Sequence, residues 1–175
     1  MGLPIALVGQ AVGQSAFPRL AAYATERRWT DLRRILIRAL GTVLLLAVPA
    51  LLLLIGLGHR IIHVLFEHGS FGAPAASLTY EVLVSYAIAL PAYVATEVLT
   101  RGLIALRDTR TPLVTNTVQI LGRALFMALL VGSLGALAIP RAFAVMATGE
   151  TIALAVILAL RLRGRMRSTD QLATA

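Results

Sequence analysis

Residues 39–58, ALGTVLLLAVPALLLLIGLG, decide the fold class of this chain. Thr42 is the only strongly polar side chain in the stretch. A helix needs about 20 mostly apolar residues to cross the hydrocarbon core of a bilayer. A helix on the surface of a soluble protein needs a polar face for water, and this stretch has none. It therefore predicts a membrane-spanning helix.

The rest of the chain contains further segments of the same kind. Hydrophobic residues make up 58% of the 175 residues and charged residues only 14%, whereas about a quarter of the residues of a soluble domain are charged. We therefore expect an all-α, polytopic transmembrane helix bundle with about five membrane-spanning helices and short interfacial helices. The expected spans are residues 3–17, 39–58, 78–100, 113–134 and 139–160.

The basic residues predict how the bundle is oriented. They are all arginines, and the formal net charge is +8. Thirteen of the sixteen lie on one side of the expected membrane, which the positive-inside rule makes cytoplasmic. The N-terminus is then outside, and residues 164–175 form a cytoplasmic basic and polar tail. Anionic membrane lipids, rather than nucleic acid, are the expected partners of these arginines: Arg19, Arg27, Arg28, Arg33, Arg34, Arg38, Arg101, Arg107, Arg110, Arg161, Arg163, Arg165 and Arg167.

Two of the connections are expected to be interfacial helices. Residues 19–38 have the pattern of an amphipathic helix at the membrane surface, with Thr30 as its N-cap, and a solvated cytoplasmic elbow is the favoured interpretation of this connection. On the outer side, His59, His63 and Glu67 have the spacing of metal ligands. The same spacing is typical of the polar face of an interfacial helix, which is the favoured interpretation, and no metal is expected.

The connection between the third and fourth spans is predicted to be a tight cytoplasmic turn. Asp108 can accept hydrogen bonds from nearby backbone amides or pair with Arg110. Thr111 is expected to cap the fourth span, with Pro112 at the first helical position.

Polar groups inside the spans are candidates for function, because burying them in a membrane is unfavourable. Glu97 and Arg101 are four residues apart and can pair at the inner end of the third span, and Pro91 is expected to kink that span. Such groups hold helices together, line a cavity, or face lipid with their charged ends reaching the membrane surface. The candidate cavity residues are Arg123, Gln119, Arg101, Glu97, Glu150, Gln10 and Gln14.

The fourth and fifth spans hold the deepest charges. Thr115, Gln119 and Arg123 form one stripe along the fourth span, and Glu150 lies at a similar depth in the fifth, where it can pair with Arg123.

No nucleophile–base pair, phosphate-binding loop or metal cluster stands out. The chain is therefore expected to be no enzyme and to need no cofactor.

Three motifs lie at the ends of the expected spans. They are Gly2-Leu-Pro with Gly9-Gln-Ala and FPRL (residues 17–20), then LFEHGSF (residues 65–71), and VLTRGLIALRDTRTP (residues 98–112). Together they resemble the MurJ/MviN family of lipid II flippases, which belongs to a superfamily with multidrug and polysaccharide exporters. The similarity runs from residue 1 to about residue 163.

The resemblance implies peptidoglycan biosynthesis. Family members move undecaprenyl-pyrophosphate-linked lipid II across the bacterial plasma membrane by alternating access, with two lobes around a cationic cavity. Residues 1–163 correspond to part of the second lobe, the eighth to the twelfth of about fourteen spans. The missing first-lobe spans, in the same or a separate chain, are then expected partners, besides membrane lipids and a lipid-linked anionic substrate.

The resemblance also suggests roles for single residues. Arg123 and Arg101 would attract the anionic headgroup, and the inner turn or hinge would consist of Asp108, Arg110, Thr111, Pro112 and Pro91. Two alternatives stay open. One is a drug or polysaccharide exporter of the same superfamily, with ion coupling through Glu97 or Glu150. The other is a non-transporting membrane subunit in which the polar residues only hold helices together.

Overall fold

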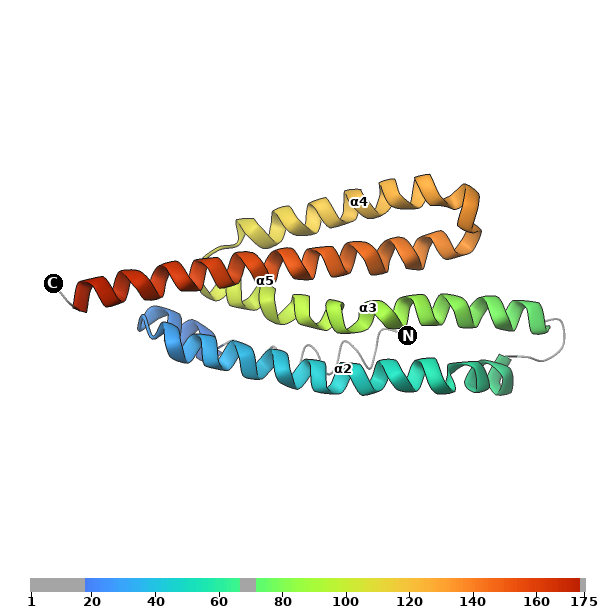
Figure 1. The fold of residues 1–175 in the computed structure, drawn as a ribbon, viewed down its shortest axis with the longest axis horizontal. Helices are drawn as coiled ribbons and strands as arrows, with labels where there is room; N and C mark the ends of the chain where they lie inside the picture. Colours follow the sequence, from blue (N-terminus) through green and yellow to red (C-terminus); the bar gives the residue numbers. More distant parts are fainter. Residues whose placement is uncertain (1–17, 67–71, 174–175) are drawn as a thin grey trace.

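The computed structural model describes residues 18–66 and 72–173, and these residues form helices joined by short turns, with no strand among them. Four long helices run side by side along one axis (Figure 1). The expected all-α bundle is confirmed. The long helices are α2 (Trp29–Phe66), α3 (Ala73–Ala105), α4 (Arg110–Leu134) and α5 (Ala138–Ala173), with a short 3₁₀ turn, η1 (Gly135–Leu137), between the last two. Residues 18–25 are also helical and precede α2.

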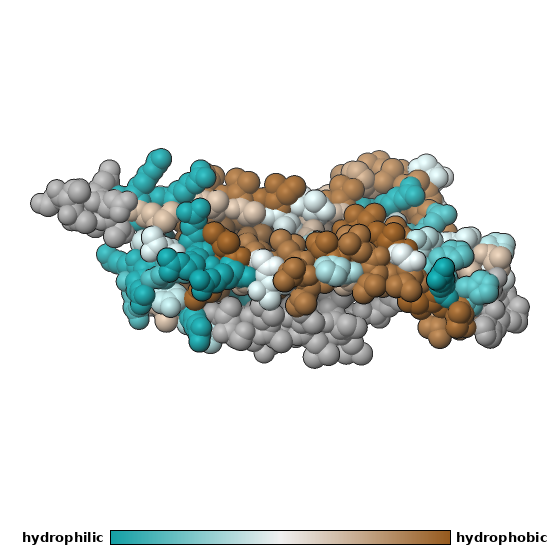
Figure 2. All heavy atoms as spheres, turned by 60° about the horizontal axis from the view of Figure 1, so that its bottom comes forward, coloured by the Kyte–Doolittle hydropathy of each residue, from teal (hydrophilic) through white to brown (hydrophobic). Residues whose placement is uncertain are grey.

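The described helices have the length and surface of membrane-spanning segments. Three helical stretches among them are long and apolar enough to cross a membrane, namely Trp29–Phe66, Ala73–Ala105 and Arg110–Ser168. The third folds back at Gly135, whose left-handed φ of 52° helps to end α4. On the coloured part of the face shown in Figure 2, apolar residues cover much of the shaft, and hydrophilic residues gather most densely at the end where α2 begins. The expected span at residues 3–17 lies outside the described residues.

The core of the bundle lies around α3. This helix packs against α2 on one side and α5 on the other, whereas α4 packs on α5 and hardly touches α3 (Figure 1). Gly102 shows how closely the helices approach, since a Cβ added there would lie 2.9 Å from Leu36 of α2 and 3.1 Å from Leu158 of α5. Small residues permit such close approach in membrane bundles. The α2 side chains in this core recur every three or four residues: Leu32, Leu36, Ala39, Val43 and Ala47.

Three expected boundaries are wrong. No separate surface helix spans residues 19–38, because α2 runs without a break from Trp29 through the apolar stretch. Thr30 consequently lies in the first turn of α2 instead of capping it. The chain turns earlier, at residues 26–28, where Arg27 has a left-handed φ of 57°. His59 and His63 belong to the last turns of α2 rather than to a short helix of their own, and Glu67 lies outside the described residues.

At its other end the fold extends further than expected. Helix α5 continues to Ala173, so much of the segment expected to be a tail is helical. Leucine, alanine and arginine favour helices, and nothing in this segment interrupts the pattern strongly. Three arginine-containing segments lie at one end of the bundle: the turn at residues 26–28, the α3–α4 turn and the end of α5 (Figure 1). We call this end the arginine-rich end of the bundle.

Gly122 of α4 offers a test of the contact between α4 and α5. A Cβ at this position would collide with the end of the Met146 side chain and come within 3.1 Å of its sulfur. Because the end of the flexible Met146 side chain can move aside, we expect Gly122→Val to destabilise the bundle only at the lower end of what overpacking costs, by about 1 kcal/mol. The loss is measured as a lower midpoint in detergent unfolding followed by circular dichroism. Gly132→Val is the matched control, because Gly132 lies in the same helix with nothing within 4 Å of an added Cβ. An equal loss in both variants would contradict the expectation.

Candidate functional site

A cavity of about 430 Å³ lies between α3 and α4, with α5 as its third wall. The cavity exists because α4 leans on α5 and leaves a space beside α3 that side chains do not fill. All three helices contribute polar groups to it. These groups are Thr96, Glu97 and Thr100 from α3, Asn116, Gln119 and Arg123 from α4, and Glu150 from α5.

Helix α4 presents its polar face to the cavity. Asn116, Gln119 and Arg123 are three and four residues apart, a spacing that places them on one face of a helix. Gln119 is the only buried side chain of α4. Leu121 and Leu125 are 65% and 62% exposed, and their side chains give α4 an apolar surface away from the cavity. Gln119 and Arg123 of the expected stripe therefore face the bundle, whereas the cavity is lined by the flanking Asn116 and not by Thr115.

The acidic residues of the cavity differ in their partners. Glu97 pairs with Arg101 at 3.6 Å, as expected from their spacing. The expected pair between Arg123 and Glu150 is absent from the described residues. The Arg123 guanidinium instead lies 5.7 Å from the centre of the Phe143 ring. Phe143 and Glu150 are seven residues apart on α5, which is about 10 Å along a helix, so Arg123 is level with the aromatic ring and not with the carboxylate.

Aromatic rings form the wall of the cavity near Arg123. The Phe143 ring lies 5.6 Å from Tyr86 and 6.1 Å from Tyr93, measured between centroids. Tyr93 and Phe143 both line the cavity, although neither was predicted as a site residue. The signal for Tyr93 was present in the sequence, because Tyr93, Glu97 and Thr100 recur at helical spacing. The sequence holds no such signal for Phe143, whose place depends on how α5 packs.

A hydroxyl pair joins α3 and α5 beside the cavity. The Thr96 and Thr151 hydroxyl oxygens are 2.8 Å apart, and Thr151 Oγ1 lies 2.9 Å from the carbonyl oxygen of Ala92. Hydrogen bonds of this kind between helices are common inside membranes. They fix the register of the two helices that carry Glu97 and Glu150.

The turn between α3 and α4 is organised around Asp108, which is 8% exposed. Its carboxylate accepts hydrogen bonds from the Thr111 backbone amide at 3.1 Å and from the Thr111 hydroxyl at 2.7 Å. It also forms an ion pair with Arg161 of α5 at 3.0 Å. Burial alone would raise the pKa of Asp108, but the Thr111 hydrogen bonds and the Arg161 charge outweigh it, and the pKa lies below its ordinary value.

This geometry confirms one expectation about the turn and corrects others. Asp108 does accept a backbone hydrogen bond, but its ion-pair partner is Arg161 and not Arg110. Thr111 is not the cap of α4, because α4 already begins at Arg110. For the same reason Pro112 is the third residue of the helix, not the first. Asp108 takes the capping role, since its side chain reaches the free amide of the first turn.

The cavity thus gathers four of the predicted site residues: Arg123, Gln119, Glu97 and Glu150. Arg101 adjoins this group through its pair with Glu97. Helix α3 continues through Pro91. Gln10 and Gln14 lie outside the described residues.

The amino-acid sequence matches a known family over almost its whole length. The model of the family described as "Lipid II flippase MurJ" matches residues 1–173. A probable lipid II flippase MurJ from Rhizobium tropici is 35% identical over 111 residues, which are 63% of this chain and 21% of that protein. The lipid II flippase MurJ of Thermosipho africanus is 32% identical over 80 residues, 46% of this chain and 17% of that protein. The chain therefore spans about a fifth of the length of these relatives.

Solved structures show the same fold. A lipid II flippase MurJ in an inward closed conformation has a TM-score of 0.77 and 24% identity, covering 90% of this chain and 33% of that one. An inward-facing multidrug resistance transporter of the MATE family has a TM-score of 0.79 and 10% identity, covering 94% of this chain and 39% of that one. At these identities the likeness concerns the arrangement of the helices alone, which the flippase and the drug transporter share.

Proposed function

Because the chain belongs to the lipid II flippase MurJ family, we propose that it forms part of one lobe of a flippase that moves lipid II across the bacterial plasma membrane. The chain corresponds to about 21% of the relatives' length, so the remaining spans of such a transporter lie in other residues, in the same or a separate chain. In this proposal α2, α3, α4 and α5 are four of the five spans expected for residues 1–163. This places the chain in peptidoglycan biosynthesis.

The observation behind this proposal is the polar cavity at Arg123. Lipid II bears a pyrophosphate, and a cavity inside a membrane that holds a guanidinium without a carboxylate partner among the described residues suits such a group. Arg101 contributes less, because Glu97 balances its charge. Gln119, buried on the same face of α4, is a further donor toward the cavity.

We infer the orientation from the arginine-rich end of the bundle. This end gathers three turns or helix ends that are far apart in sequence (Figure 1). A cytoplasmic position for it follows the positive-inside rule. The C-terminus is then cytoplasmic and the Asp108 turn is the inner hinge between α3 and α4.

A chimera tests the proposal. Residues 1–173, the part of the chain that the family model matches, replace the corresponding helices of the Rhizobium tropici protein, and the chimera is expressed in cells depleted of their own flippase. We expect the chimera to restore growth and the 175-residue chain alone not to, because a two-lobed cavity needs spans that the chain does not contain. Failure of a chimera that reaches the membrane at the normal level would count against a flippase role. Full rescue by the chain alone would refute the part-lobe arrangement.

A further inference from the structure

A second pocket, of about 270 Å³, lies at the arginine-rich end of the bundle. It is enclosed by the helix of residues 18–25, the start of α2, the α3–α4 turn and α5. Arg27, Arg107 and Arg165 line it together with Trp29, and none of its lining residues in the described part of the chain is acidic. This pocket is distinct from the cavity at Arg123.

Two of the three arginines are placed by the same backbone motif. Arg27 and Arg107 have left-handed φ angles of 57° and 61°. Each follows a helix end that is closed by a hydrogen bond from the next residue, Arg28 to Tyr23 and Asp108 to Leu103, both at 2.9 Å. Glycine is the usual residue at such a position. Two helix ends that are far apart in sequence thus each bring an arginine to one pocket.

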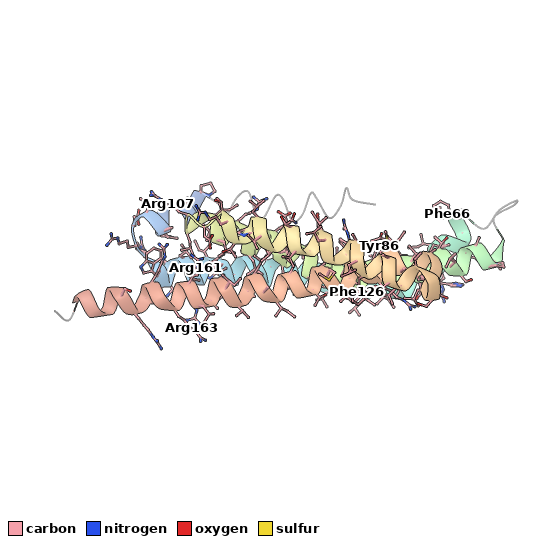
Figure 3. All side chains as sticks on the ribbon, turned by 90° about the horizontal axis from the view of Figure 1, so that it is seen from above. Phe66, Tyr86, Arg107, Phe126, Arg161 and Arg163 are labelled. Carbon is pink, nitrogen blue, oxygen red and sulfur yellow. The ribbon has the colours of Figure 1, made fainter. Side chains whose placement is uncertain are left out.

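The third arginine is held against the same wall. Arg165 donates a hydrogen bond from Nη2 to the Leu106 carbonyl at 3.1 Å, and its guanidinium lies 4.9 Å from the centre of the Trp29 ring. Figure 3 shows Arg107 at this end of the bundle, while Arg163 points outward from α5. The pocket therefore combines three guanidinium groups with one aromatic side chain.

Three described carboxylates at this end, Glu26, Asp31 and Asp108, pair with arginines outside the pocket. Glu26 and Asp31 both pair with Arg28, at 3.4 Å and 2.8 Å, and Asp108 pairs with Arg161. In the described part of the chain, neither Arg27 nor Arg107 has an ion-pair partner. Positive charge gathered in a pocket attracts anions, and guanidinium groups suit phosphate oxygens, with which they form paired hydrogen bonds.

We propose that this pocket binds the phosphate group of an anionic phospholipid at the membrane surface. A water molecule takes up about 30 Å³ in the liquid, so the pocket has room for a phosphate and some bound water. A lipid is favoured over soluble phosphate by the surface beside the pocket. Ile104 is 37% exposed two residues before Leu106, which lines the pocket, and Ile37 is 56% exposed about two turns beyond Trp29. Both offer acyl chains apolar surface near this end of the bundle. The proposal does not depend on transport activity.

Trp29 provides a local reporter, because it is the only tryptophan of the chain. The purified chain in a neutral detergent is titrated with phosphatidylglycerol or with phosphatidylcholine, each brominated on its acyl chains, and quenching of Trp29 fluorescence is recorded. We expect phosphatidylglycerol to quench at a concentration roughly tenfold lower, given the usual contribution of a few basic residues near an anionic surface. Arg27→Gln with Arg107→Gln is expected to remove this preference, and Arg27→Lys with Arg107→Lys to keep most of it.

The matched control is Arg163→Gln with Arg167→Gln, which removes the same charge from exposed positions outside the pocket. This control is expected to keep the preference. Equal quenching by both lipids, or equal losses in the two double variants, would refute a specific site. If inorganic phosphate at millimolar concentration alters Trp29 fluorescence in an Arg27- and Arg107-dependent way while phosphatidylglycerol does not quench, the ligand is soluble phosphate and the lipid proposal is wrong. Circular dichroism confirms that each variant is folded.

Discussion

Arg123→Ala is expected to abolish the growth of flippase-depleted cells that rely on the chimera. The alanine variant leaves the cavity without its arginine, while Glu97 and Glu150 still line the same space. An anionic headgroup then meets two carboxylates and only one nearby cation, Arg101, which already pairs with Glu97. Loss of a charge-assisted contact of about 1.5–3 kcal/mol lowers binding by roughly tenfold to a hundredfold. The measurement is growth, together with externally accessible lipid II.

Two further variants separate a role in the cavity from a general effect of charge. Arg123→Lys keeps a cation beside Phe143 and is expected to retain part of the activity. Arg141→Ala removes an arginine that lines a different groove, with Glu81 and Tyr80, and is expected to leave growth unchanged. Normal growth of the Arg123→Ala chimera at normal expression would exclude Arg123 from the transport path. The chimera itself would still support a flippase role, so the two results are separable.

The sequence predicted the fold class and the inward face of α4 well, because both follow from hydrophobic patterning. A stretch without a polar face is recognisable in isolation, and so is a polar stripe at helical spacing. Gln119 and Arg123 could therefore be placed toward the bundle before any neighbour was known. The same reasoning found Glu97 and Arg101 as a pair, since both lie on one helix.

Contacts between helices were predicted less well, because they depend on relative register. The expected spans put Arg123 and Glu150 at similar depths, but the register in which α4 packs on α5 brings Arg123 level with Phe143 instead. Asp108 finds Arg161, more than fifty residues away, and not its neighbour Arg110. The break at residues 26–28 escaped prediction because arginine rarely takes the left-handed conformation seen at Arg27.

Asp108→Ala is expected to destabilise the arginine-rich end of the bundle by about 2–3 kcal/mol. Loss of a helix cap accounts for about 1 kcal/mol, and loss of the charge-assisted bond from the Thr111 hydroxyl for most of the rest. The ion pair adds little, because the Arg161 side chain is 48% exposed. Asp108→Asn keeps an acceptor for the Thr111 amide and is expected to lose about half as much. The measurement is the detergent-unfolding midpoint, followed by circular dichroism.

The contribution of Asp108 also depends on pH, in a direction set by its lowered pKa. The unfolded carboxyl titrates near its ordinary value of 3.8, and the folded one below it. The stabilisation by the Asp108 carboxylate is therefore complete at a pH above its ordinary pKa, and it is lost as the pH falls through the lower pKa of the folded state. Between pH 5 and 7 the difference in stability between the native chain and Asp108→Ala is expected to stay constant.

Asp31→Ala is the matched control for this prediction, because Asp31 also pairs with arginines at the same end of the bundle. Its partners Arg28 and Arg34 have side chains that are 53% and 64% exposed, and exposed ion pairs contribute at most about 1 kcal/mol. A much smaller loss is therefore expected for Asp31→Ala than for Asp108→Ala. Equal losses in the two variants would show that surface charge, and not the buried cap at Asp108, stabilises this end. Such a result would also argue against a hinge at the α3–α4 turn. A hinge there requires that Asp108 holds the first turn of α4 in place through Thr111.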